Sequence, residues 1–184
     1  MARQTRHQQR GVTLIEVMVT VLVLSIGLLG MAALQARLQK SEVEAYQRSQ
    51  ALLLLSDMAN RLAVNRSNAA GYPAAISSVG AGMNCPTSSA TLLQQDASEW
   101  CRLLQGASER LDGSSVGTLL GGRGCVEQLS AGEYLITVAW QGLTPLTAPP
   151  AGVACGSGSY NGTGGCSDDR CRRVVTTVVR VVGL

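Results

Sequence analysis

The feature that most constrains this chain is an apolar run of about 25 residues behind a short basic segment. Residues 1–11 read MARQTRHQQRG, and VTLIEVMVTVLVLSIGLLGMAALQA follows them. A helix over this run is about 37 Å long at 1.5 Å per residue, enough to cross a hydrocarbon layer about 30 Å thick. Arg3, Arg6 and Arg10 precede the run and favour the cytoplasmic side, so we expect everything after it to lie across the membrane.

One carboxylate interrupts the apolar run. Glu16 lies four residues after Val12, and no basic residue within the run can pair with it. A carboxylate near the end of a spanning helix costs less than the about 2.5–3.5 kcal/mol typical of the centre, but it still needs a partner. Cleavage after Gly11 would create a free amine on Val12. Charge and spacing therefore predict that this cation pairs with Glu16 of the same or an adjacent subunit.

The sequence GVTLIE at residues 11–16 resembles the class III signal sequence of type IV pilins and type II secretion pseudopilins. In that family the prepilin peptidase cuts after the glycine and methylates the new N-terminal residue, and the glutamate guides assembly by pairing with a neighbouring N-terminal amine. The resemblance implies that Gly11 is the cleavage residue, Val12 the methylated N-terminus and Glu16 the assembly carboxylate. Val12 replaces the usual phenylalanine, and Ala33 stands where major pilins often have a helix-bending proline. Both departures suit a minor subunit better.

Two other interpretations of the N-terminal segment remain open. In the first, the run is an ordinary membrane anchor and Glu16 extends toward the interface. In the second, it is a secretory signal peptide, because Gly30-Met31-Ala32 resembles a small-x-small cleavage site. The run is longer than the 7–15 residues of a typical signal core, and its early carboxylate is out of place there.

Helical periodicity continues past the apolar run and predicts one helix from Val12 to about Asn65, roughly 80 Å long. Its second half is amphipathic. The predicted apolar positions are Leu34, Leu38, Ala45, Leu52, Leu55, Ala59, Leu62 and Ala63, and the predicted polar positions include Glu44, Gln47, Asp57 and Arg61. A coiled coil is the alternative for this half, but four consecutive leucines at 52–55 are too broad for an a/d seam. The stretch from Ala69 to Pro73 is expected to end the helix.

A second, shorter helix is predicted from Thr91 to about Gly106. Thr91 with Gln94 resembles a capping box, and Gly106 can close the end. Trp100 and Cys101 fall on its apolar face and are expected in the core.

The later third of the chain changes to a β-type pattern. Residues 133–140 and 173–182 predict two strands, and a weaker strand is expected around Cys125 to Leu129 after a turn at residues 121–124. Antiparallel pairing is expected, because no crossover helices separate these strands. The predicted fold class is α+β, with a long N-terminal helix packed on a small antiparallel sheet, which is also the pilin fold.

All six cysteines lie beyond the apolar run, which fits disulfides formed in an oxidising compartment. The candidates are Cys85, Cys101, Cys125, Cys155, Cys166 and Cys171. Six cysteines allow 15 connectivities, and the sequence does not choose among them. The long loop from Gly142 to Arg170 is rich in Gly, Ser, Thr and Pro, and we expect disulfides to hold it in place.

Other sequence features argue against catalysis and nucleic-acid binding. The only histidine, His7, lies in the segment that cleavage would remove, which excludes histidine-dependent catalysis in the mature chain. The cysteine spacings include no C-x-x-C, and Gly156-Ser157-Gly158 lacks the third glycine of a dinucleotide fingerprint. The net charge of +3 comes largely from the leader, and aromatic residues make up 3%. We therefore predict no enzyme activity, no catalytic residue, no cofactor, no metal and no nucleic-acid partner.

Within the family, SDMANRL at residues 56–62 and the following Asn65-Arg66 resemble the type IV pilus modification (PilV) family of minor pilins. The helix around Trp100 and the strands at 138–140 and 172–177 add to this resemblance. It implies a minor pilin that primes type IV pilus assembly, in a tip complex with other minor pilins, beside the major pilin and with a tip adhesin as a further partner. Cell adhesion and twitching motility are the processes it implies. The alternatives are a type II secretion pseudopilin, a tip-exposed binding module built on the 142–170 loop, and a secreted protein released after Ala32.

The predicted organisation has three parts. Residues 1–11 form a leader that is removed, residues 12–38 the membrane-spanning and filament-core half of the helix, and residues 39–184 a periplasmic globular head. The expected location is the bacterial inner membrane, with a single pass, and then the pilus tip.

Overall fold

The computed structural model describes residues 11–112, 114–115 and 119–181. The first helix, α1, spans Leu14–Val64, so the long predicted helix is confirmed and starts two residues later than expected. By contacts the chain divides into two units, residues up to Glu42 and residues from Val43 onward. Predicted boundaries at residues 11 and 38 stay predictions.

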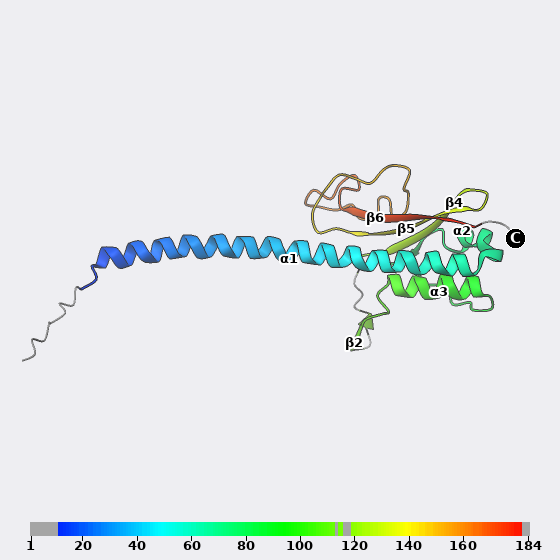
Figure 1. Cartoon of the computed structure of the whole chain (residues 1–184), viewed down its shortest axis with the longest axis horizontal. Coiled ribbons are helices and arrows are strands. Elements are labelled where there is room, and N and C mark those ends of the chain that lie inside the picture. The colour runs from blue at the N-terminus through cyan, green and yellow to red at the C-terminus, as the bar shows by residue number, and fades with distance from the viewer. Residues whose placement is uncertain (1–10, 113, 116–118, 182–184) are drawn as a thin grey trace, which may run out of the picture. The chain divides into compact units, whose positions relative to one another are not determined.

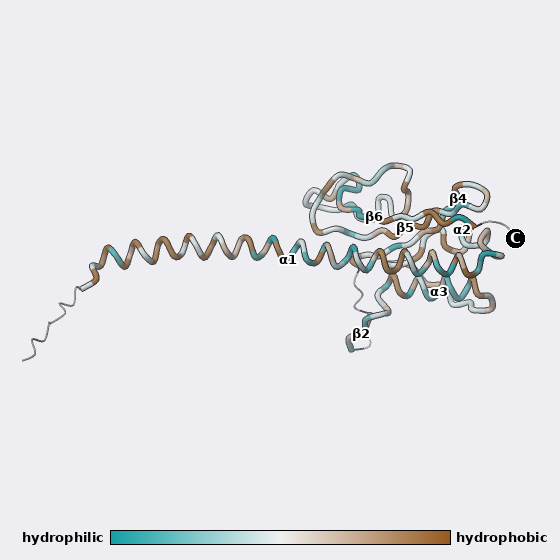
Figure 2. Tube along the Cα trace, viewed as in Figure 1, coloured by the Kyte–Doolittle hydropathy of each residue, from teal (hydrophilic) through white to brown (hydrophobic). Residues whose placement is uncertain are grey.

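The described residues contain one helix long and apolar enough to cross a membrane, and it is α1. Figure 2 shows the hydrophobic colouring that recurs along its N-terminal part. The large apolar side chains from Val12 to Leu38 are each between 50% and 77% exposed. Apolar surface of this extent needs a lipid or protein environment.

In the second unit, the C-terminal part of α1 buries a narrow stripe. Ala51, Leu55, Met58 and Leu62 are at most 5% exposed, at spacings of four, three and four residues. The prediction that Leu52 lies on the buried face is wrong, because this side chain is 48% exposed. Four consecutive leucines point to all sides of the helix, so their pattern does not indicate which of them faces the core.

The structure also corrects a polar assignment on α1. Gln47 was predicted on the solvent side and is only 6% exposed. It precedes Ala51 by four residues and so lies on the same buried stripe. Its Oε1 atom has no hydrogen-bond partner among the described residues.

The segment predicted to end the first helix is itself helical. The helix α1 ends at Val64, a 3₁₀ helix (η1) covers Arg66–Gly71, and a short helix (α2) covers Tyr72–Ala75. Pro73 lies in the first turn of α2, where its missing N–H is not needed. The prediction that the first helix ends in this region is therefore correct, but it did not include the two short helices, η1 and α2.

The second long helix, α3, spans Leu92–Leu104, as predicted within two residues at each end. The Thr91 hydroxyl accepts a hydrogen bond from the Gln94 backbone N–H at 3.3 Å. The Gln94 side chain accepts from the Ser88 hydroxyl, so the predicted capping box is formed only by half. At the other end Gly106 adopts a φ of +86°, a conformation that favours glycine and closes the helix.

Four strands form one antiparallel sheet in the order β1-β4-β5-β6, which confirms the predicted α+β class. Figure 1 labels β4, β5 and β6 of this sheet. The strands are β1 Val79–Gly80, β4 Arg123–Ser130, β5 Glu133–Gln141 and β6 Arg172–Arg180. A separate two-stranded hairpin joins β2, Arg110–Leu111, to β3, Ser114–Ser115. The turn predicted at 121–124 is shorter than expected, because β4 already begins at Arg123. The predicted last strand ran to Val182, which lies outside the described residues.

One face of the sheet carries the main hydrophobic core against α1 and α3. Trp100 of α3 is fully buried, as predicted, and its indole N–H donates to the Leu54 carbonyl at 2.9 Å. The ring lies directly on Gly124 of β4, where an added Cβ would come within 2.3 Å of two ring carbons. Gly124 is therefore the position that lets α3 approach the sheet closely.

The six cysteines form three disulfides, which fixes one of the 15 possible connectivities. The pairs are Cys85–Cys101, Cys125–Cys155 and Cys166–Cys171. The second pair links β4 to the long loop, and the third closes the loop at the start of β6. The expectation of a disulfide-held loop is confirmed.

The long loop also builds a second, smaller core on the other face of the sheet. Cys125 and Ala139 of the sheet pack with Cys155 and Tyr160 of the loop. The buried Arg172 guanidinium donates from Nη1 to the Val153 and Cys155 carbonyls at 2.7 and 3.0 Å. These contacts give the 142–170 loop a packing role on the sheet.

Candidate functional site

The N-terminal candidate residues lie at the start of α1. The Thr13 carbonyl accepts from the backbone N–H groups of Glu16 and Val17 at 3.1 and 3.3 Å, so it opens the helix. Glu16 is in the first turn, and Gly11 and Val12 precede the helix in an exposed segment without regular secondary structure. The Gly11–Val12 peptide bond therefore lies outside the helix.

Glu16 is exposed at this helix start. None of the ion pairs formed among the described residues includes it. The first turn is a favourable place for a carboxylate, because the helix dipole is positive there. An amine on Val12, two residues ahead of the first helical residue, would add a cation at the same end.

The comparisons with known proteins bear on this arrangement. Residues 6–32 match the family of the prokaryotic N-terminal methylation motif, and residues 33–108 match the type IV pilin Tt1218 family. The two matches meet without a gap. This chain is a type IV pilin-like protein. No curated protein and no solved structure matches it.

Membership of this class has direct consequences for the pilin-like chain. The pilin family consists of structural subunits. With the methylation motif, it implies processing by prepilin peptidase and assembly with other pilins. The apolar N-terminal helix fits membrane anchoring of a pilin.

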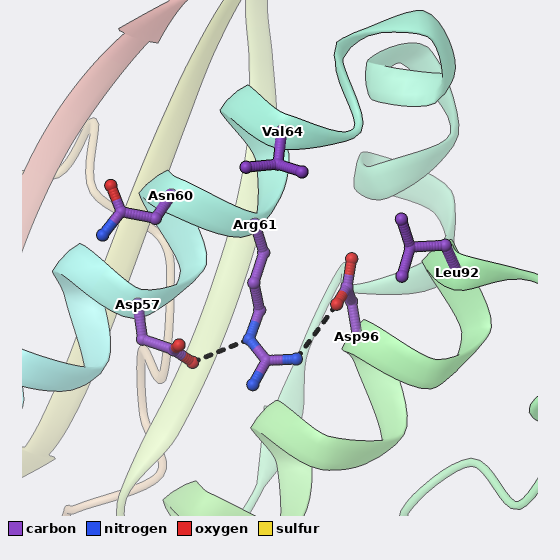
Figure 3. Close-up of a pocket in the computed structure, with 6 residues that line it drawn as sticks. All are labelled: Asp57, Asn60, Arg61, Val64, Leu92 and Asp96. Carbon is purple, nitrogen blue, oxygen red and sulfur yellow. Dashed lines mark hydrogen bonds and ion pairs between the residues drawn. The ribbon is translucent and has the colours of Figure 1, made fainter.

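A second cluster of charged residues lies between α1 and α3 of the pilin-like head. Figure 3 shows Arg61 of α1 extended between Asp57 on its own helix and Asp96 on α3. Its Nε atom lies 2.9 Å from Asp57 Oδ2, and its Nη1 atom lies 3.0 Å from Asp96 Oδ1 and 2.8 Å from Glu99 Oε2. The Arg61 side chain is 21% exposed and that of Asp96 only 6%. The prediction that Arg61 lies on a solvent-facing stripe is therefore wrong.

Two further side chains complete the cluster. The Tyr72 hydroxyl donates to Asp96 Oδ2 at 2.5 Å, and it accepts from the Asn65 side-chain amide at 3.1 Å. Asp96 thus receives hydrogen bonds on both carboxylate oxygens, from Arg61 and from Tyr72. This network holds the end of α1, the start of α2 and the middle of α3 together.

The electrostatics follow from these contacts. Burial lowers the pKa of Arg61, but its hydrogen bonds to Glu99, Asp57 and Asp96 outweigh that effect and raise the pKa above its ordinary value. Burial, followed by the hydrogen bond to Asp96, raises the pKa of Tyr72. The hydrogen bond from Arg61 lowers the pKa of Glu99. Arg61 therefore stays charged, Glu99 stays ionised and Tyr72 stays neutral across the physiological range.

A shallow cavity of about 210 Å³ opens beside this cluster. Its lining residues are Asp57, Asn60, Arg61, Val64, Leu92 and Asp96 (Figure 3). Among the described residues, no group of three or more His, Cys, Asp or Glu side chains is arranged to hold a metal ion. The charged side chains that line the cavity, Asp57, Arg61 and Asp96, are engaged in ion pairs with one another.

The cluster shows what the sequence reasoning missed. Asp57, Arg61 and Asn65 belong to the segment that resembled the PilV family, and their contacts in the head are structural. Asp96 was not singled out, although an acidic residue between Leu93 and Trp100 on an apolar face was a usable signal.

Proposed function

We propose that this type IV pilin-like protein is a minor pilin that primes pilus assembly and lies in a tip complex with other minor pilins. The observation that carries the proposal is the exposed Glu16 in the first turn of α1, four residues from Val12. The replacements at Val12 and Ala33 and the PilV-like segment at residues 56–62 favour a minor over a major subunit. The tip complex would include a tip adhesin and adjoin the major pilin.

Processing by prepilin peptidase supplies the partner for Glu16 in this proposal. Removal of residues 1–11 leaves a methylated amine on Val12, which stays cationic. In the inner membrane the apolar half of α1 anchors the subunit, with the head in the periplasm. In the filament Glu16 meets the amine of a neighbouring subunit, and pairing offsets the cost of burying two charges.

The test is Glu16→Ala in a host that lacks the wild-type copy. We expect cleavage after Gly11 to continue, because the substituted residue lies beyond the cut, and we expect filament number to fall strongly. The matched control is Glu42→Ala, which removes an exposed carboxylate further along the same helix. Electron microscopy counts the filaments. Normal filament numbers with Glu16→Ala would contradict the assembly role.

A pseudopilin of a type II secretion system has the same N-terminal chemistry. Deletion of the gene in the native host distinguishes the two functions. Loss of surface pili would support a pilus subunit, and loss of secreted exoproteins with normal pili would support a secretion pseudopilin.

A second candidate function is recognition of a surface or an adhesin by the 142–170 loop. The observation that favours it is that two disulfides hold the loop while residues 161–165 remain exposed. Deleting the loop would uncover the second core, so a point change is the better test. Thr163→Arg should lower adhesion and leave filament number unchanged. Unchanged adhesion would count against this function.

A further inference from the structure

The last strand, β6, forms an edge of the four-stranded sheet. It pairs with β5 over nine residue pairs without a register shift. The Val181 N–H donates to the Gly132 carbonyl on the β5 side, so odd-numbered residues of β6 direct their backbone groups toward β5. In an antiparallel ladder the even-numbered residues then direct theirs away from it.

The outward groups belong to Val174, Thr176, Val178 and Arg180. Within the described part of the chain, no other strand and no loop hydrogen bond pairs with them. A row of free N–H and C=O groups of this length is a template for another strand.

Natural proteins usually protect such an edge with lysine, proline, a bulge or a very short strand. The interior of β6 reads VVTTVV, with no charge and no proline, and its pairing has no bulge. The opposite edge of the same sheet is β1, which is only two residues long. The β1 edge is therefore protected against pairing with another strand by its short length, and the β6 edge has no such protection.

The side chains along β6 also have room for a neighbour. Val175 and Val179 lie half-buried at the margin of the main core. On the other face Thr176 is exposed and Val178 is 48% exposed. A strand placed beside β6 would cover both rows, and apolar side chains on its core-facing side would extend the main core.

The charges at the two ends of β6 indicate the partner. Arg170, just before the strand, is exposed, and the Arg180 side chain is 76% exposed although it pairs with Glu133. Antiparallel pairing of two β6 strands centred on Thr176 would bring the exposed Arg180 of each copy close to the exposed Arg170 of the other copy. Like charges brought together at both ends are unfavourable. Carboxylates at the ends of a different strand would be favoured.

We propose that β6 binds, by strand addition, an extended segment of another protein that is rich in Val, Ile and Thr and carries a carboxylate at each end. The β6 edge includes neither Val12 nor Glu16, so the inference stands whether or not the chain primes assembly.

The test uses the full chain in detergent micelles and a labelled, end-capped peptide of sequence EVTVTVTE. We expect saturable binding by fluorescence anisotropy and slower hydrogen exchange at the amides of Val174, Thr176 and Val178. The same peptide, methylated on every Val and Thr amide nitrogen, keeps its side chains but cannot pair through its backbone. It should bind about tenfold more weakly or worse. A KVTVTVTK peptide should also bind more weakly than EVTVTVTE.

On the protein side, Thr176→Pro removes one outward N–H at an edge position where proline is tolerated. It should weaken peptide binding, and Thr176→Ser should not. Equal binding of the methylated peptide, or no exchange protection at the three amides, would overturn the proposal. A chain that sediments as a dimer without peptide, and as a monomer with Thr176→Pro, would overturn the choice of partner in favour of a second copy.

Discussion

The Nη1 atom of Arg61 on α1 lies 3.0 Å from Oδ1 of the buried Asp96 on α3. The second oxygen of Asp96 accepts from Tyr72 of α2, so one carboxylate joins three helices. Replacing Arg61 leaves the buried Asp96 carboxylate without its ionic partner, and replacements of this kind are among the most destabilising.

We predict that Arg61→Ala lowers the free energy of unfolding by about 2–4 kcal/mol, somewhat less than for a fully buried pair because Arg61 is partly exposed. Urea unfolding of the full chain in detergent micelles, followed by tryptophan fluorescence, measures the change. The control Arg48→Ala removes an exposed arginine of the same helix and should change stability by less than about 0.5 kcal/mol. Equal effects of the two variants would contradict the role of the Asp96 network.

The disulfides should contribute unequally to stability. Cys125 and Cys155 are 30 residues apart and Cys166 and Cys171 only five. In the chain-entropy estimate, the longer loop gives about 3–4 kcal/mol and the shorter about 2 kcal/mol. The Cys125→Ala/Cys155→Ala pair should therefore lower the unfolding midpoint more than Cys166→Ala/Cys171→Ala. It should also make the 142–170 loop the first site of limited proteolysis. The reverse order would count against the second core.

Gly124→Ala should destabilise the head by about 1–3 kcal/mol, because its Cβ would overlap the Trp100 ring. Gly152→Ala is the matched control, since a Cβ there has no atom within 4 Å. Thermal unfolding in detergent micelles compares the two. Similar midpoints for both variants would show that α3 does not pack on β4 as described.

Alkaline pH should destabilise the head through two tyrosines. Burial raises the pKa of Tyr72 and of Tyr160 above the ordinary value near 10. Above about pH 10 the unfolded chain loses these protons while the folded chain keeps them, so stability falls as pH rises from there through the folded pKa. Below pH 10 the contribution is constant.

Urea unfolding between pH 8 and pH 11 measures this slope. Tyr160→Phe should flatten it, because the ring stays buried and the titrating hydroxyl is gone. The variant also loses the hydrogen bond to the Gly121 carbonyl, so its stability at pH 8 should be slightly lower. An unchanged slope would rule out Tyr160 as a source.

Elements with a strong local pattern were predictable from the sequence. The apolar run and its amphipathic continuation gave α1, the Val- and Thr-rich stretches gave β5 and β6, and Thr91 with Gly106 gave the limits of α3. These signals come from residues that are close together in the chain, so a single sequence is enough to detect them.

Features that depend on distant contacts were not predictable. Leu52 and Leu55 look alike in the sequence, and only the position of the sheet decides which is buried. Gln47 and Arg61 fit a polar stripe, yet the packing of the head buries the first and largely covers the second. The disulfide pairing depends on the path of the 142–170 loop. The residues next to Arg172 in the sequence do not indicate that its guanidinium donates hydrogen bonds to carbonyl groups of that loop.

The N-terminal candidates Gly11, Val12 and Glu16 came from spacing and from family resemblance. The structure places them at an exposed helix start, and the family matches cover this segment. Their individual roles stay predictions, because cleavage and methylation are chemical events that a folded chain does not display.

The most direct test of the type IV pilin-like account is mass spectrometry of the mature N-terminus, from membranes of the native host. The account predicts a terminal peptide that begins at Val12 and carries one added methyl group. A terminus at Met1 or Ala2 would indicate a simple membrane anchor, and a terminus at Ala33 an ordinary secreted protein. Either result would contradict processing by prepilin peptidase and with it the proposed pairing of Glu16.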